Sequence, residues 1–150
     1  MEHLSSRTVD VKQMLKCGQL FTCSTVQKGI CQMPFMFEKL DVYQKAVDFA
    51  DKIMVLTEHF PRGYYFLTDQ LNRSALSIAT NIAEGNGRFT KADRRNFFTI
   101  ARGSVQECIP LLELARRRGF ISEQTFAGLR EELQTIAKML SGLISGIEKR

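Results

Sequence analysis

The chain has 150 residues, of which 44% are hydrophobic and 25% charged, and its formal net charge at pH 7 is +5. This length and composition are typical of one globular domain and exclude a chain that is disordered throughout. No apolar stretch reaches the roughly 18 residues that a membrane-spanning helix needs, so we expect no membrane association. The positive charge favours an anionic partner without requiring one.

Residues 1–35 show no sustained periodicity, whereas a regular helical pattern begins directly after Pro34. We therefore expect an irregular leader over residues 1–35 and a helical domain over residues 36–150. The leader is interpreted as disordered, or as the result of a start assigned too far upstream, because Met33 and Met36 lie where the pattern begins. A functional tail is the alternative interpretation.

The first helix is predicted over residues 38–59, where apolar residues follow the spacing of one buried face. These residues are Ala46, Phe49, Ala50 and Ile53. Asp41–Lys45 and Asp48–Lys52 are acid-before-base pairs four residues apart, which are expected to support the exposed face. Pro61 and Gly63 predict a turn, because proline cannot continue the helix and glycine permits the reversal.

The second helix is predicted over residues 65–84, and the glycines of Gly85-Asn86-Gly87 are expected to end it in a left-handed conformation. Its apolar face consists of Leu71, Ala75, Ile78, Ala79 and Ile82. A polar group lies on the opposite side, formed by Arg73, Ser77, Asn81 and Glu84. This group is interpreted as a structural hydrogen-bond network between helices or as a subunit contact.

The third helix is predicted to begin after Thr90, because Thr90 and Asp93 have the Ser/Thr-x-x-Asp/Glu spacing of a capping box variant. Its seam has heptad spacing and contains Phe97, Ala101, Ser104, Cys108, Leu111 and Ala115, widened by Phe98, Val105 and Leu112. Gly119 is expected to end the helix. Three arginines in the last turn, residues 116–118, are attributed to the favourable interaction of cations with the helix dipole.

The fourth helix is predicted from about Ser122 to Glu148, and it has the clearest seam in the chain. Steps of three and four residues connect Phe126, Leu129, Leu133, Ile136, Leu140, Leu143 and Ile147. All three connections between the helices are short, so successive helices are expected to be antiparallel. The fold class is therefore all-α, an up-down-up-down antiparallel four-helix bundle with an irregular N-terminal extension.

No catalytic apparatus, metal site or cofactor site is evident in the sequence. The four cysteines, at positions 17, 23, 31 and 108, form no CxxC pair and indicate a reduced, cytoplasmic protein. The Glu-x-x-His motif of bundle metal sites and the Walker loop are both missing. His59 is interpreted as a helix-terminal residue that interacts with the dipole. We therefore expect a protein that is not an enzyme.

A basic group around the connection between the second and third helices is the best candidate binding site. It consists of Arg88, Lys91, Arg94, Arg95 and Arg102. At 100° per residue, Lys91, Arg95 and Arg102 fall within roughly 40° of one another on the third helix, and Arg94 sits beside them. Such a basic stripe is suited to phosphates. The alternative is a solvated helix face that is partly paired to nearby acidic side chains.

Three segments carry a resemblance to a known family: FEKLDVYQKA, DQLNRSALSIATNIAEGNGR and FFTIARGSVQE. They resemble the four-helix-bundle family that includes proteins encoded in intervening sequences of bacterial large-subunit ribosomal RNA. The accessory variability determinant of diversity-generating retroelements looks like a relative. The resemblance implies a homo-oligomeric ring, a pentamer, with a basic surface for nucleic acid. For the retroelement relatives it also implies a reverse-transcriptase partner.

The leading functional hypothesis is a non-enzymatic, oligomeric bundle that binds structured RNA or DNA through its basic surface, as an accessory to a reverse transcriptase. The alternative is a protein-interaction scaffold with no nucleic-acid ligand, in which the basic charge is incidental. The two hypotheses differ in one measurable property, which is binding of nucleic acid at low salt.

Overall fold

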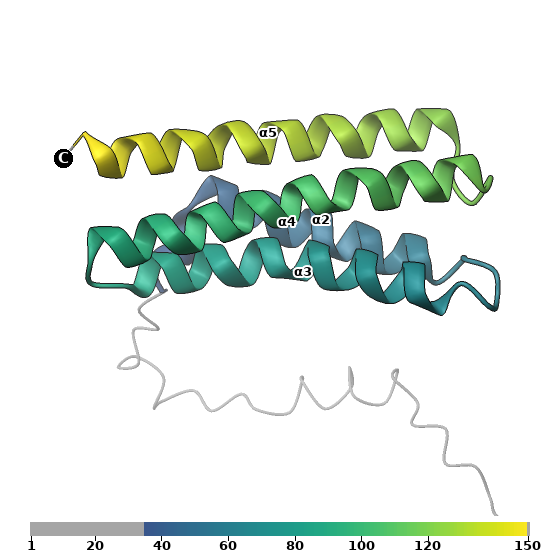
Figure 1. The fold of residues 1–150 in the computed structure, drawn as a ribbon, viewed down its shortest axis with the longest axis horizontal. Coiled ribbons are helices and arrows are strands. Elements are labelled where there is room, and N and C mark those ends of the chain that lie inside the picture. The colour runs from purple at the N-terminus through teal and green to yellow at the C-terminus, as the bar shows by residue number, and fades with distance from the viewer. Residues whose placement is uncertain (1–34, 150) are drawn as a thin grey trace, which may run out of the picture. The chain divides into compact units, whose positions relative to one another are not determined.

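The computed structural model describes residues 35–149, and Figure 1 shows these residues as a bundle of helices. A short 3-10 helix, η2 (Met36–Lys39), is followed by α2 (Asp41–Thr57), α3 (Tyr65–Gly87), α4 (Lys91–Arg117) and α5 (Glu123–Glu148). The predicted all-α four-helix bundle is confirmed. The predicted leader, apart from Phe35, lies outside the described residues.

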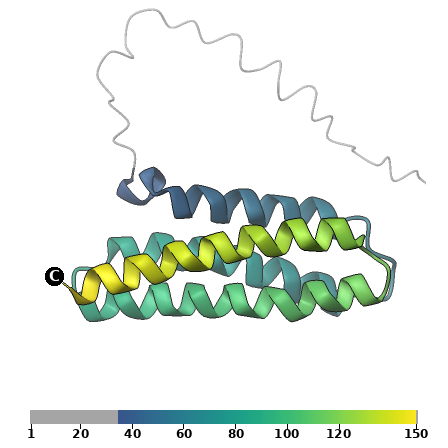
Figure 2. The ribbon, with the colours of Figure 1, turned by 90° about the horizontal axis from the view of Figure 1, so that it is seen from above.

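Each helix packs against its neighbours in the sequence, and α5 closes the bundle by packing against α2. The views in Figures 1 and 2 show the four helices running side by side along one axis, joined by short connections at alternate ends. This arrangement places α4 between α3 and α5. No helix within residues 35–149 is long and apolar enough to cross a membrane.

The apolar seams that the sequence predicts form one continuous core. The whole predicted face of α3 is buried, and so are the first five seam residues of α5, while Leu143 and Ile147 are half-buried. In α4 the buried face is rotated relative to the prediction. Phe98 and Leu112, expected at its margin, are completely buried, whereas Phe97 and Leu111 are half-buried.

The first helix begins later than the sequence predicts. Leu40 has an extended backbone, with φ −80° and ψ 120°, and separates η2 from α2. Leu40 also packs against the core, which fixes this break, and the acidic Asp41 then occupies the favourable first turn. At the other end, Gly63 adopts a φ of 99°, as expected for the glycine of the predicted turn.

The prediction that Gly85-Asn86-Gly87 stops the second helix is wrong, because α3 continues to Gly87. Among residues 35–149, only Gly63 and Gly119 have a positive φ. Gly85 is instead buried in the helix against α4, where a side chain would collide with Phe98. The absence of a side chain at position 85 serves close packing and not a left-handed turn.

The N-terminal caps of α4 and α5 follow the expected chemistry. Thr90 Oγ1 accepts a hydrogen bond from the Asp93 backbone N–H at 3.1 Å, and Asp93 Oδ2 accepts one from the Thr90 hydroxyl at 2.6 Å. Ser122 Oγ similarly accepts from the Thr125 N–H at 3.1 Å. Each cap satisfies a backbone donor that would otherwise lack a partner in the first turn.

Candidate nucleic-acid interface

The basic stripe predicted from the sequence lies at the start of α4 and along the side of this helix that faces α5. Arg88 belongs to the connection from α3, and the other four residues belong to α4. Arg95 Nε lies 3.3 Å from Glu148 Oε1 of α5, and Arg102 Nη1 donates to Ser141 Oγ of α5 at 3.5 Å. The stripe therefore runs along the boundary between the two helices.

Arg88 is engaged by neighbouring side chains of α3 and α4. Its Nη2 atom lies 3.1 Å from Glu84 Oε2, one helical turn earlier. Its guanidinium also stacks over the ring of Phe97, 4.4 Å from the centroid. Such cation–π contacts hold the guanidinium plane in a fixed orientation but leave its edge accessible to a phosphate.

Lys91 and Arg94 differ from the rest of the stripe because they border a pocket of about 220 Å³ between α4 and α5. The other lining residues are Phe98, Gly142, Leu143, Gly146 and Ile147. The Arg94 Nε atom is buried and has no hydrogen-bond partner within the described part of the chain. Neither Lys91 nor Arg94 forms an ion pair with any residue from 35 to 149.

This pocket has the properties of a site for an anionic group. A buried guanidinium nitrogen without a partner is unfavourable, and a small rotation of the Arg94 side chain would let a ligand's acceptor oxygen satisfy it. Gly142 and Gly146 add no side chain to the pocket lining, and the space beside each is open, because a Cβ built on either residue meets no atom within 4 Å. The side chains present are therefore suited to a phosphate or carboxylate.

The polar group predicted on α3 is only partly brought together. Ser77 Oγ and Ser104 Oγ are hydrogen-bonded at 2.9 Å across α3 and α4, and Asn81 Nδ2 donates to Ser77 Oγ at 3.0 Å. Glu84 pairs with Arg88 instead, and Arg73 is exposed. Ser77 and Asn81 thus form a local network, and the subunit contact stays a prediction.

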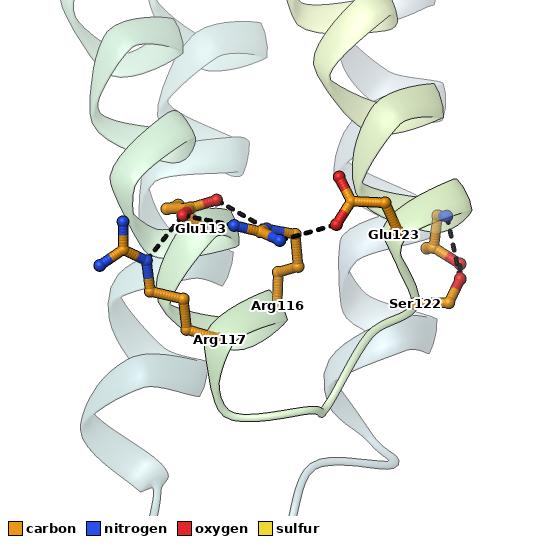
Figure 3. A network of polar contacts seen from close by, with 6 residues as sticks. Glu113, Arg116, Arg117, Ser122 and Glu123 are labelled. Carbon is orange, nitrogen blue, oxygen red and sulfur yellow. Dashed lines mark hydrogen bonds and ion pairs between the residues drawn. The ribbon is translucent and has the colours of Figure 1, made fainter.

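The arginines at the end of α4 do more than interact with the helix dipole. Arg116 binds Glu113 through Nε and Nη2, both at 2.8 Å, and its Nη1 atom donates to Glu123 Oε2 of α5 at 2.7 Å. Arg117 Nε donates to Glu113 Oε1 at 2.7 Å. Figure 3 shows Arg116 lying between the two carboxylates, so it joins α4 to α5.

The hydrogen bonds from Arg116 and Arg117 lower the pKa of Glu113 from 4.5 to about 2. They therefore keep this carboxylate ionised over the ordinary pH range. The charges of the two arginines are largely neutralised in this network, and they lie at the opposite end of α4 from Lys91. Sequence reasoning left Arg116–Arg118 out of the binding site, and the geometry of Arg116 and Arg117 gives a physical reason to keep them out.

Phe89 is a residue at this interface that the sequence analysis did not single out. It lies between Arg88 and the Thr90 cap in the connection from α3 to α4, and its relative exposure is 104%. The sequence does contain a signal for an exposed aromatic residue at this site, because Phe89 stands in a very short connection between Arg88 and Lys91. Periodicity does not reveal it, since periodicity identifies buried faces only.

The described part of the chain contains no cluster of metal-binding side chains and no activated cysteine. No group of three or more His, Cys, Asp or Glu side chains is arranged for a metal ion within residues 35–149. Burial, together with the charge of Glu107, raises the pKa of the Cys108 thiol to about 12. Cys108 is therefore a protonated core residue and not an activated nucleophile. The Nδ1 atom of His59 lies 3.0 Å from the Val55 carbonyl oxygen.

Comparison with known proteins agrees with this fold. The family model described as "23S rRNA-intervening sequence protein" matches residues 38–142. A similar solved structure is a protein of unknown function from the S23 ribosomal protein family of Bacteroides thetaiotaomicron. It is 28% identical, with a TM-score of 0.64, over 69% of this chain and 97% of that one. No curated protein matches the chain.

Proposed function

We propose, since this chain belongs to the 23S rRNA-intervening sequence protein family, that it is a non-enzymatic bundle protein that binds structured RNA or DNA. The contact surface is the basic stripe formed by Arg88, Lys91, Arg94, Arg95 and Arg102. Its residues neutralise phosphates of the backbone and read no base sequence.

The observation that carries this proposal is the pocket beside Lys91 and Arg94. Two cations without ion-pair partners in the described residues line the same pocket of about 220 Å³, and the Nε atom of one is buried without a hydrogen-bond partner. A backbone phosphate supplies both the negative charge and the acceptor oxygens that this arrangement lacks. Burying an unpaired guanidinium nitrogen costs free energy, and a role in solubility alone gives no reason for that cost.

The length of the stripe also suits a nucleic-acid strand. Lys91 and Arg102 are eleven residues apart in α4, which corresponds to about 16 Å along the helix axis. A B-form strand carries one phosphate per 3.4 Å of its axis, so the stripe faces a segment of about five nucleotides. Several phosphates are then within reach of the long, flexible side chains.

We further propose that the bundle acts as a homo-oligomer, a pentamer by the family resemblance. We also propose that it is an accessory to a reverse transcriptase, as the resemblance to the retroelement accessory protein implies. Several copies of the stripe on one ring would raise the apparent affinity by multivalency. Sedimentation of the full chain tests the assembly, with a species of five subunits expected. A monomer at micromolar concentration would contradict the assembly without removing the stripe.

Filter binding at two salt concentrations tests the nucleic-acid proposal. If four of the five cations of the stripe each neutralise one phosphate, the affinity for a structured RNA falls about 100-fold between 50 and 200 mM monovalent salt. A DNA hairpin of the same sequence tests whether the sugar matters. If neither binds at 50 mM salt, the proposal fails and the protein-interaction scaffold becomes the better description.

A further inference from the structure

Phe89 is held in an unusual position for a large apolar side chain. The three-residue connection Arg88–Thr90 has an extended backbone at both of its ends, with ψ of 142° at Arg88 and 145° at Thr90. The ring between them is as exposed as in an isolated residue, at 104%. No part of residues 35–149 therefore covers either face of the ring.

The backbone that carries this ring is anchored, even though the surface of the ring is free. Gly87 is the last residue of α3, and Lys91 is the first residue of α4, so both neighbours of the connection belong to packed helices. The Thr90 cap bonds to the Asp93 backbone, and the guanidinium of Arg88 stacks on Phe97. A residue whose backbone is already anchored loses only side-chain freedom, over two rotatable bonds for phenylalanine, when its ring binds a ligand.

The surroundings of Phe89 indicate which ligand it fits. Arg88 precedes it, and Lys91, Arg94 and Arg95 follow within the first turns of α4. An apolar ring among cations is the composition of sites for single-stranded nucleic acid, where bases stack on the ring and the cations hold the backbone. The exposed Phe66, by contrast, packs near Tyr64 at the other end of α3 and has an aromatic neighbour.

From this arrangement we propose that Phe89 is a stacking platform for an unpaired nucleotide base. The inference rests on the proposed binding function and narrows its ligand to nucleic acid with a single-stranded segment, such as a hairpin loop. A ring on the protein surface reaches the face of a base only where that base is not already stacked within a duplex. The phosphate next to the stacked base then lies against Lys91 and Arg94.

Tryptophan fluorescence offers a direct test, because the chain contains no tryptophan. In the full chain, Phe89→Trp introduces a single fluorophore at the proposed platform. Phe66→Trp is the matched control, since Phe66 is 65% exposed and lies about 30 Å away at the opposite end of α3. We expect a twelve-nucleotide single-stranded RNA to quench the fluorescence of the Phe89→Trp variant but not that of the Phe66→Trp variant. A blunt RNA duplex should quench neither variant.

Affinity measurements complete the test with three further variants. Phe89→Ala should weaken binding of the single-stranded RNA by about 5- to 150-fold and leave binding of the duplex nearly unchanged. Phe89→Tyr should retain the affinity, and Phe66→Ala should have no effect. Repeating the titration with DNA of the same sequence shows whether the platform distinguishes the two sugars, and stacking predicts similar losses for both.

The outcomes separate this inference from the binding proposal itself. If Phe89→Ala binds the single strand as tightly as the parent while Lys91→Gln weakens it, the stacking platform is wrong and the phosphate stripe stands. If the parent binds no nucleic acid at low salt, both proposals fail. If Phe89→Ala instead dissociates the oligomer without changing the affinity, Phe89 is a contact between copies of the chain, which also overturns the stacking inference.

Discussion

Gly85 of α3 lies directly against the ring of Phe98 of α4. A Cβ built at Gly85 would stand 2.8 Å from Phe98 Cε1 and 3.0 Å from the Cβ of Phe97. Phe98 is only 1% exposed and belongs to the core, so any movement of its ring disturbs the packing of the residues around it. The close approach of the two helices at this point fixes the end of α3 and, through the short connection that follows, the position of the basic stripe.

Gly85→Ala is expected to destabilise the bundle. The added methyl group forces Phe98 or the backbone to move, which costs about 1–3 kcal/mol in a packed core. This cost exceeds the gain of up to about 1 kcal/mol that alanine normally brings inside a helix. Urea denaturation measures the difference in unfolding free energy.

Gly128→Ala is the matched control for this prediction. Gly128 also lies inside a helix, α5, but a Cβ there meets no atom within 4 Å. Alanine should therefore stabilise the protein by about 0.5–1 kcal/mol. If both variants gain stability, the contact between Gly85 and Phe98 is not tight in solution.

Gly85 is a residue whose role in the fold cannot be predicted from the sequence alone. Four helices could be predicted because seams such as that of α5 repeat at steps of three and four residues, and burial of such a face dominates helix stability. A glycine near a helix end, however, fits both a left-handed turn and a close contact. Only the position of Phe98 in the neighbouring helix decides between them.

Leu133→Ala is expected to cost about 2–5 kcal/mol of unfolding free energy. Leu133 is 0% exposed at the middle of the α5 seam, so truncation leaves a cavity among rigidly packed neighbours. Thermal or urea unfolding measures the loss. A cost below about 1 kcal/mol would mean that the neighbouring helices collapse to fill the space, or that α5 is less firmly packed than its burial indicates.

The Glu113 network predicts a specific pH dependence of stability. In the folded protein the pKa of the Glu113 carboxyl group is about 2, below the ordinary 4.5, because Arg116 and Arg117 bind its ionised form. The stabilisation is therefore fully present above pH 4.5 and is lost as the pH falls from 4.5 towards 2. Since Glu113 is partly solvent-exposed, salt should reduce the effect.

Glu113→Gln tests this assignment. Glutamine keeps the shape of the side chain but carries no charge, so the difference in stability between parent and variant should shrink as the pH is lowered through this window. Chemical denaturation at pH 6, 4 and 2.5 measures it. A difference that stays constant across these values would show that the carboxylate of Glu113 does not titrate with a lowered pKa.

The candidate site illustrates a second limit of sequence reasoning. The angular spacing of Lys91, Arg95 and Arg102 places them on one helix face, and the structure keeps them on that face. Their partners lie on another helix, as for Arg95 and Glu148, and depend on the relative rotation and register of α4 and α5. For the same reason Lys52 pairs with Glu132 of α5, at 2.8 Å, and the predicted pair with Asp48 does not form.

Arg73→Ala distinguishes the two interpretations of the polar group on α3. Arg73 is exposed, so its truncation should change the unfolding free energy of the protomer by less than about 0.5 kcal/mol. If it forms a subunit contact, the variant should instead shift the sedimentation profile towards smaller species. An unchanged profile would assign Arg73 to the solvated surface.

The basic stripe gives the prediction that bears most directly on function. Lys91→Gln and Arg94→Gln should each reduce the slope of log affinity against log salt by about 0.9 for a duplex and about 0.7 for a single strand. The loss should be similar for all sequences, because phosphate contacts carry no base information. Substitution of Arg95 or Arg102 should have a smaller effect, since Glu148 and Ser141 already engage these side chains.

Arg117→Gln is the control for the stripe, because it also removes one charge from α4 but at the opposite end, where Arg117 is bound to Glu113. It should leave both the affinity and the salt slope unchanged. A triple substitution to glutamine at Lys91, Arg95 and Arg102 that binds as the parent does, with the same slope and an intact oligomer, would show that these three side chains contact no phosphate. If the oligomer dissociates instead, the stripe belongs to a contact between subunits, and the affinity of the separated protomers then decides whether any phosphate contact remains.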